Sequence, residues 1–340
     1  MIAGLLIAAL GATAIAGVSS GWEAFGAAAL SGLGVGIAWP AQDTLLARLV
    51  SLSQRSAVYA VRHATLNLGL GIGALLAAVI VDLNRPGTFT AVYWLDAASF
   101  VLAIPLLLAP SAAPGKETSP AGDQTPAEVG TGYRIVLRDR IFVRLWILTA
   151  ILVAVGYAQF NSALPAIATS IGGLSAGALG MVFAANTITV VLAQLVVLRL
   201  LGGVRRTRAL AMLCLLWGAS WLIVVAGGLT QSVILFVAAG VVFALGETLL
   251  GPTVPALVND IAAEAVRGRY NGASTLAYTT GFATGPLLAG FALGRGLVMP
   301  LVLGLVVVCL GCALCALRLE SRLPRAVNTV PGSSGEVVPT

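Results

Sequence analysis

One carboxyl group in this sequence lies where it could do chemistry, that of Glu247 in the stretch "VILFVAAGVVFALGETLL" at 233–250. No other charged residue occurs in that stretch, so the acid has no ionic partner nearby in the sequence. An acid in apolar surroundings either takes up a proton or finds a polar partner, because burial of an isolated charge is costly. Two roles therefore stay open for Glu247: binding of a proton or a cationic substrate, and a structural hydrogen bond to neighbouring backbone.

Amide and hydroxyl side chains recur in the preceding apolar stretches with helical spacing. Tyr157 and Asn161 are four residues apart and share one helix face, whereas Asn186 and Gln194 lie about two turns apart. Such groups can bind a polar substrate. They can equally join one helix to another by hydrogen bonds, which is their commoner use in membrane bundles.

The composition places these residues in a membrane protein. Hydrophobic residues make up 59% of the 340 and charged residues 9%, and the mean hydropathy is +0.99. These values lie outside the range of soluble domains. Ten apolar stretches are long enough to cross a bilayer as helices, and they lie near 2–18, 24–46, 57–82, 88–109, 141–167, 174–201, 208–228, 231–258, 270–294 and 297–317. The sequence predicts an all-α polytopic membrane protein with about ten transmembrane helices.

The arginines predict the orientation of the chain. All but two of the 19 Lys and Arg residues lie in or beside alternate loops, and the exceptions are Arg85 and Arg295. Positively charged loops stay in the cytoplasm. We therefore expect a multi-pass protein of the plasma (inner) membrane with both termini in the cytoplasm.

Two further acids lie near the ends of apolar stretches. Asp96 follows a Tyr-Trp pair typical of a membrane interface, a depth at which a carboxylate is hydrated, so a structural role is favoured over proton coupling. Asp260 precedes Arg267 and Arg269 at a predicted cytoplasmic end. Charge pairs there can lock a gate, or the segment can be a solvated loop whose arginines only orient the chain.

A polar segment divides the chain in two. Residues 111–132 are rich in Pro, Gly, Ser, Thr and Ala, a composition typical of a disordered linker. We predict a bundle at 1–110, a cytoplasmic linker at 111–132, a six-helix bundle at 133–320 and a cytoplasmic tail at 321–340. The start of the second bundle, "YRIVLRDRIFVRLW", alternates apolar residues and arginines as in a helix that lies on the membrane surface.

An internal repeat supports this division. A shift of 212 residues aligns Gly69 with Gly281 and Gly73 with Gly285, without a gap. Glycines four residues apart let helices approach closely, so we assign these four and the adjacent Pro286 to helix packing. Duplicated membrane units with parallel repeats are typical of one large class of transporters.

Several segments resemble one family in the same order. The tenth and eleventh helices of the major facilitator superfamily are similar to "GPTVPALVNDIAAEAVRGRYNG" and the "TTGFATGPLLAG" that follows it. The seventh and eighth are similar to "YAQFNSALPAIATSIGG" and "GALGMVFAANTITVVLAQ", and the sixth to "YWLDAASFVLAIPLLL". The branch that these segments most resemble is that of bacterial drug-efflux proton antiporters.

The resemblance also predicts a departure from the family. Residue 1 matches residue 213 in the repeat, so the family's first two helices and the Gly/Asp/Arg-rich loop after them have no counterpart. The expected fold is a truncated major facilitator fold with four helices and then six. By the symmetry of the repeat, a misplaced start codon or a truncated gene explains this better than a natural ten-helix transporter.

The resemblance implies secondary active transport, with proton-coupled efflux of small amphipathic molecules by alternating access and Glu247 against the central cavity. The alternative is a truncated membrane fragment that does not transport. The implied partners are the lipid bilayer, a small-molecule substrate and protons. We expect a monomer that does not bind nucleic acid.

Other patterns do not support an enzyme or a cofactor. Cys309, Cys312 and Cys315 have CxxCxxC spacing, but they lie on an apolar stretch without a fourth ligand, so they are small packing residues. "GLSAG" at 173–177 matches a hydrolase elbow only formally, since the one histidine, His63, is far along the chain. No Walker sequence is present, which excludes this type of ATP-driven transport. The sequence predicts no enzyme activity, no cofactor and no metal.

Overall fold

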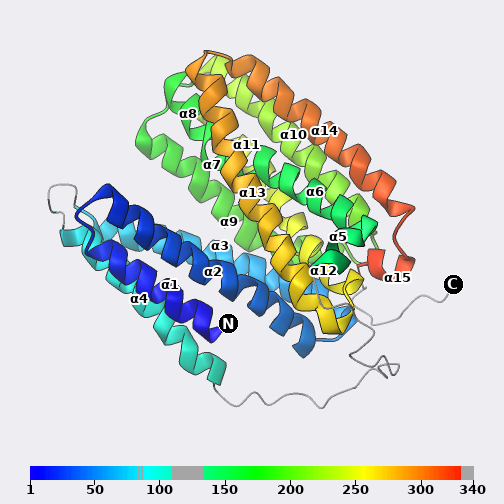
Figure 1. The fold of residues 1–340 in the computed structure, drawn as a ribbon. Coiled ribbons are helices and arrows are strands. Elements are labelled where there is room, and N and C mark those ends of the chain that lie inside the picture. The colour runs from blue at the N-terminus through cyan, green and yellow to red at the C-terminus, as the bar shows by residue number, and fades with distance from the viewer. Residues whose placement is uncertain (83–84, 86, 109–132, 331–340) are drawn as a thin grey trace. The chain divides into compact units, whose positions relative to one another are not determined.

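The computed structural model describes residues 1–82, 85, 87–108 and 133–330, and every regular element in these residues is a helix (Figure 1). This confirms the predicted all-α membrane fold. Within the described ranges, nine helical segments are long and apolar enough to cross a membrane. The predicted linker at 111–132 and the end of the predicted tail, 331–340, lie outside the described residues.

Most spans are single long helices. They are α2 (Gly21–Leu49), α3 (Arg55–Ile80), α4 (Gly87–Leu108), α9 (Ala176–Leu200), α10 (Arg206–Thr230), α13 (Arg267–Gly294) and α14 (Val298–Glu320). The segment that we predicted as the first of ten spans is α1 (Ile2–Ala16), which has 15 residues. That is shorter than the about 20 residues that usually cross a bilayer, so the described part has nine long apolar helical segments and this shorter apolar helix, in agreement with the prediction of about ten spans.

Two spans consist of consecutive short helices. The first comprises α6 (Arg140–Val155), α7 (Tyr157–Asn161) and α8 (Ala163–Ser170), and it breaks at Gly156 and Ser162. The second comprises α11 (Val233–Leu250) and α12 (Val254–Ile261). Residues 251–253, "GPT", separate these two helices, because Pro252 lacks the amide hydrogen that would continue the hydrogen bonds of α11. The Thr253 hydroxyl replaces one lost backbone hydrogen bond at this break, since it donates to the carbonyl of Leu249 at 2.6 Å.

The predicted surface helix at the start of the second half is interrupted. It forms α5 (Arg134–Arg138), ends at Asp139 and restarts as α6. The cause is local, because the Asp139 carboxylate accepts hydrogen bonds from the backbone amides of Ile141 and Phe142 and so caps the N-terminus of α6. The helix α5, which precedes this cap, therefore has only five residues.

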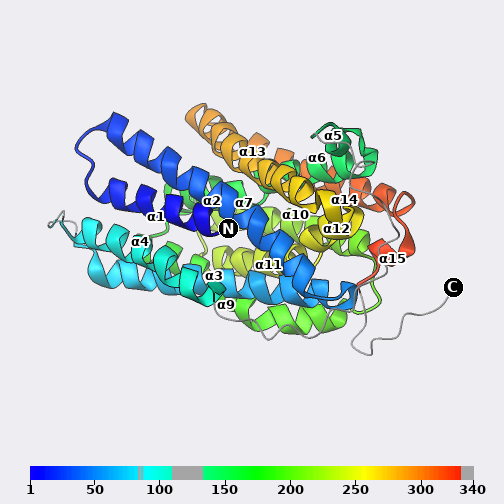
Figure 2. The ribbon, with the colours of Figure 1, turned by 60° about the horizontal axis from the view of Figure 1, so that its bottom comes forward.

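The first of two compact units contains Met1–Leu49, Leu70–Thr131 and Glu264–Thr275. In it α1 packs against both α2 and α4 (Figure 2). Glycine makes the first contact possible. A Cβ atom at Gly34 would lie 2.2 Å from the amide nitrogen of Ala8, and one at Gly4 would lie 2.7 Å from that of Ala38. The two backbones therefore meet through small residues, as is common between membrane helices.

The second unit contains Val50–Gly69, Gly132–Ala263 and Leu276–Thr340. In this unit α10 packs against α11 and α14, α9 packs against α11, and α14 packs against α6. The buried indole of Trp221 lies at the centre and donates to the carbonyl of Val155 at 3.2 Å. The C-terminal helix α15 (Arg325–Asn328) also belongs to this unit, which holds the candidate site.

Cysteine labelling tests the predicted orientation. In a Cys315→Ala background, Gly202→Cys and Ser321→Cys are expected to react with an impermeant maleimide only from the cytoplasmic side, and Thr230→Cys and Arg295→Cys only from outside. All four positions are exposed, whereas the cysteines that remain in the background are buried. The reverse pattern in oriented vesicles would contradict the orientation drawn from the arginines.

Candidate functional site

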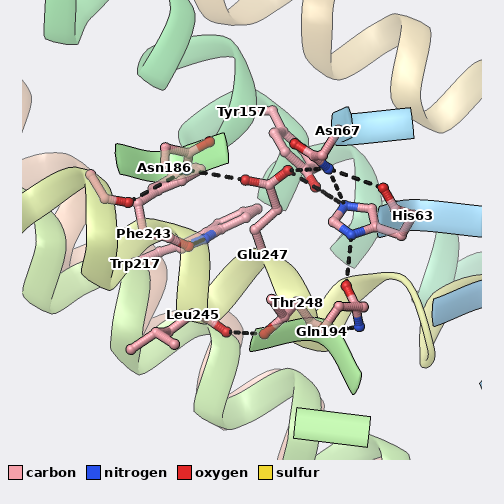
Figure 3. A network of polar contacts seen from close by, with 11 residues as sticks. His63, Asn67, Tyr157, Asn186, Gln194, Trp217, Phe243, Leu245, Glu247 and Thr248 are labelled. Carbon is pink, nitrogen blue, oxygen red and sulfur yellow. Dashed lines mark hydrogen bonds and ion pairs between the residues drawn. The ribbon is translucent and has the colours of Figure 1, made fainter. Parts of the chain in front are cut away.

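Glu247 lies near the end of α11 at the centre of a polar network (Figure 3). Its side chain is 7% exposed. One carboxylate oxygen accepts a hydrogen bond from Asn67 Nδ2 at 3.3 Å and lies 3.4 Å from His63 Nε2. The other oxygen accepts from Asn186 Nδ2, also at 3.3 Å. The acid that had no partner in its own stretch thus has partners from α3 and α9, and the Tyr157 hydroxyl of α7 interacts with it as well.

The hydrogen bonds of His63 assign its tautomer. Gln194 donates through Nε2 to the carbonyl of Thr248 at 2.9 Å, which turns its Oε1 toward His63 Nδ1 at 3.0 Å. Because that oxygen only accepts, Nδ1 carries the hydrogen of the neutral ring. His63 Nε2 is then the free acceptor, and it faces Glu247 and the Tyr157 hydroxyl, the latter at 3.2 Å.

The nearest ionisable partner of Glu247 is a histidine. Among the described residues no arginine or lysine pairs with it. An arginine would hold a permanent counter-charge beside the carboxylate, because its guanidinium does not release a proton. Histidine can bind and release one. Glu247 is therefore paired with a base and not with a permanent cation.

Glycines bring the helices of the site together. A Cβ atom at Gly251 would lie 2.7 Å from the Cβ of His63, so a side chain there would push α3 away. Trp217 fits between two more glycines, since a Cβ at Gly156 or Gly246 would lie 2.0 or 2.7 Å from its ring. Gly156 directly precedes Tyr157 and Gly246 directly precedes Glu247, so these close contacts help to position both side chains.

Aromatic rings form one side of the site. The Trp217 and Phe243 rings are stacked with centroids 4.7 Å apart, and Tyr157 meets the Trp217 ring edge-on at 5.4 Å. Trp217 Nε1 donates to the carbonyl of Phe243, which keeps the buried indole satisfied. Phe243 also stacks on Phe160, with ring centroids 4.2 Å apart, so these buried rings form a packed aromatic wall next to the network.

A second cluster surrounds Asp260 at the end of α12. One carboxylate oxygen pairs with Arg55, and the other lies 2.6 Å from Arg206 Nη1. Both partners are buried, with side-chain exposures of 6% and 1%. Arg206 also donates to the Ser56 hydroxyl and, at 2.7 Å, to the carbonyl of Val327 in α15. Within its unit, the ionic partners of Asp260 are therefore Arg55 and Arg206, and neither lies near it in the sequence.

The C-terminal segment completes this cluster. Asn328 in α15 accepts a hydrogen bond from the backbone amide of Thr207 at 3.0 Å and donates to its hydroxyl at the same distance. Thr207 lies in the first turn of α10, so Asn328 caps that helix from 121 residues away. The segment therefore positions Arg206, the residue before Thr207.

Loss of this cap is expected to destabilise the protein. Asn328→Ala removes both hydrogen bonds to Thr207 and should lower the free energy of unfolding by about 1 kcal/mol, as at other helix N-termini. The measurement is thermal unfolding in detergent, with Ser321→Ala, at an exposed position of the same segment, as the control. Equal melting temperatures for the two variants would contradict the capping role.

Some of the other predicted site residues lie in the Glu247 network and others lie outside it. Tyr157, Asn186 and Gln194 join Glu247 in one network. Asn161 is exposed and donates only to the carbonyl of Tyr157. Asp96 is exposed on α4, in the first unit, and takes no part in the network.

The glycines that we predicted as packing residues differ in how closely other helices approach them. A Cβ at Gly281 would lie 2.6 Å from the Cβ of Val153, and one at Gly285 would lie 2.2 Å from that of Ala158, so α13 packs closely on α6 and α7. Pro286 lies inside α13 beside this contact. At Gly69 and Gly73 a Cβ would meet no described atom within 4 Å, because this face of α3 is exposed. At these two glycines the role in helix packing stays a prediction.

Sequence reasoning missed four residues that the structure brings together, and they are His63, Asn67, Arg55 and Arg206. A signal existed for the first two, since they are four residues apart and share a helix face. The arginines gave no such signal, because they resembled ordinary orienting charges.

Comparisons with known proteins agree with this fold. The sequence model of the Major Facilitator Superfamily matches residues 1–173 and 147–339. An uncharacterized MFS-type transporter, YttB of Bacillus subtilis, is 24% identical over 304 residues, which cover 88% of this chain and 72% of the relative. The Na(+), Li(+), K(+)/H(+) antiporter of Planococcus maritimus is 25% identical over 287 residues, which cover 77% of this chain and 66% of the relative.

Solved structures show the same architecture. The human organic anion transporter MFSD10 has a TM-score of 0.69 at 16% identity, with 94% of this chain and 75% of that chain covered. The proton:xylose symporter XylE, bound to 6-bromo-6-deoxy-D-glucose, also has a TM-score of 0.69 at 16% identity, with 97% and 80% covered. At such identities the likeness shows the fold alone. With the family match over nearly all of its length, the chain belongs to the Major Facilitator Superfamily and has the fold of its transporters.

Proposed function

We propose that this protein is a secondary transporter that exchanges a proton at the His63–Glu247 pair for a small amphipathic cation. The observation that carries the proposal is the buried carboxylate of Glu247, paired with a titratable histidine in place of a permanent cation. One relative at 25% identity is named as a cation/proton antiporter, which supports exchange of this kind.

The charge of the pair explains why exchange is favoured. With one proton shared between them, His63 and Glu247 carry no net charge. Without it the pair is negative in a medium where an isolated charge is costly. A cationic substrate near the carboxylate would offset that charge. Binding of a proton and of the cation is then mutually exclusive, as antiport requires.

The Asp260 cluster is the proposed gate at the arginine-rich end. It links Arg55, Asp260 and Arg206, which come from three separate helices, through buried ion pairs. Opening of this end must break or rearrange these pairs. In this proposal the predicted bundles, 1–110 and 133–320, rock about the site and expose it alternately to each side of the membrane.

Proton release on substrate binding tests the proposal directly. Adding a lipophilic cation such as ethidium to the purified protein in weak buffer should acidify the solution by up to about one proton per bound cation. In vesicles, an imposed pH gradient should drive accumulation of the same cation. Ethidium binding without a pH change, or no gradient-driven movement, would contradict proton exchange. No movement would favour a membrane protein that does not transport.

Variants of His63 distinguish the roles of its two ring nitrogens. His63→Asn retains a donor near the position of Nδ1 for Gln194 but removes Nε2, so the fold should persist while proton release is lost. His63→Ala removes both and provides the comparison for stability. Full proton release by the Asn variant would show that His63 is not part of the exchanging pair.

A further inference from the structure

A groove between α6 and α14 is separate from the residues that the proposed transport uses. The two helices pack against each other in the second unit (Figure 1). The groove encloses about 690 Å³, and its walls are aliphatic except at one end. That end carries Arg144, Arg318 and Arg322. An apolar groove that ends in cations matches an amphipathic anion.

The length of the groove fits one leaflet of a bilayer. Its lining residues on α14 run from Val307 to Leu319 at helical spacing, and Arg322 follows. At 1.5 Å per residue this is roughly 20 Å along the helix. One leaflet contributes about 15 Å of hydrocarbon, with the polar headgroups beyond it. The arginines thus lie at headgroup depth when the aliphatic walls lie in the hydrocarbon.

The three arginines carry uncompensated charge. Their side chains are exposed, and none makes a side-chain hydrogen bond or ion pair with another residue in the described ranges. The nearest acids in the sequence are engaged elsewhere. Glu320 pairs with Arg205 and Arg208, and Asp139 caps α6. A guanidinium is a planar fork that matches the oxygens of a phosphate.

Space for an acyl chain exists in the middle of the groove. Gly311 lines it, and a Cβ atom there would meet no described atom within 4 Å. A larger residue at this position would occupy the groove without changing any charge. Cys315 lies four residues further on the same face, and it is the exposed one of the four cysteines.

We propose that this groove binds an anionic phospholipid from the leaflet on the arginine-rich side of the protein. Its phosphate lies against Arg144, Arg318 and Arg322, and an acyl chain lies over Gly311. The proposal rests on the membrane location of the chain and does not depend on proton exchange at Glu247. Phosphatidylglycerol is the simplest lipid with these properties. Phosphatidylcholine, whose choline offsets the phosphate charge, should bind more weakly.

Native mass spectrometry of the full chain in detergent measures this binding. Dioleoyl phosphatidylglycerol should bind more tightly than dioleoyl phosphatidylcholine. Changing the three arginines to glutamine should weaken its binding by about tenfold or more. Arg199→Gln, an exposed arginine at the end of α9 outside the groove, should leave it unchanged. Equal binding of both lipids, or undiminished binding by the triple variant, would overturn the proposal.

Two further measurements keep the test independent of the arginines. Gly311→Leu should weaken phosphatidylglycerol binding with all charges retained, whereas Gly290→Leu, at an equally open glycine of α13, should not. Bound phosphatidylglycerol should also slow the reaction of Cys315 with a maleimide in unmodified protein. Equal effects of the two leucine variants would overturn the acyl-chain site. Displacement of the lipid by inorganic phosphate at similar concentration would do so as well.

Discussion

Asp260→Ala is expected to lower the free energy of unfolding by about 3–5 kcal/mol, the usual cost of removing one partner from a buried ionic cluster. The carboxylate lies between Arg55 and Arg206, whose side chains are 6% and 1% exposed. Without Asp260, two guanidinium groups would remain buried with no counter-charge from it. Water cannot easily replace the lost partner at such low exposure.

Glu320→Ala is the matched control for this effect. Glu320 also pairs with two arginines, but Arg205 and Arg208 are 32% and 60% exposed, so solvent screens both interactions. We expect a loss of about 1 kcal/mol or less for this variant. Chemical unfolding of both variants in the same detergent gives the comparison. If Asp260→Ala cost no more than Glu320→Ala, the cluster would not be a buried ionic lock.

Asp260→Asn separates charge from shape. The amide keeps the size of the side chain and one acceptor oxygen but carries no charge. Its stability should fall between those of the wild-type protein and the alanine variant. A stability equal to that of the wild type would mean that hydrogen bonding, and not charge, holds Arg55 and Arg206.

Glu247→Gln is expected to reduce proton-driven transport by about a hundredfold or more, within the range found when a proton-transferring group is removed. The amide has nearly the size of the carboxyl group, so the helices can stay in place. It cannot bind or release a proton at Glu247's position beside His63 Nε2. Efflux driven by a pH gradient in vesicles is the measurement, at several values of external pH.

Two variants accompany the glutamine. Asp96→Asn, at an exposed carboxyl group in the first unit, should transport normally. Glu247→Leu removes one acceptor each from Asn67 and Asn186, which keep their bonds to backbone carbonyls, so it should lower stability by about 1–3 kcal/mol. Normal pH-dependent efflux by the glutamine variant would show that Glu247 is structural. The leucine variant would then be the one that loses function, through loss of stability.

Local sequence patterns were sufficient for much of this structure. Long apolar stretches indicate helices that lie in the membrane, and arginines indicate on which side of the membrane each loop lies. The helical fold and nearly all the spans followed from these signals, and the same signals singled out Glu247, which the structure places in a buried polar network. Asn186 and Gln194 were also identified, because a polar side chain in an apolar stretch needs a reason to be there.

The partners of these residues depended on the tertiary structure. Asn67 and Glu247 are 180 residues apart, and His63 reaches the same carboxylate only because Gly251 admits α3 at close range. Asp260 pairs with Arg55 and Arg206, which lie 205 and 54 residues away in the sequence, although two other arginines follow it much more closely. Hydropathy depends on each residue and its neighbours along the chain. A buried pair depends on how side chains from separate helices pack, and only the folded chain determines that.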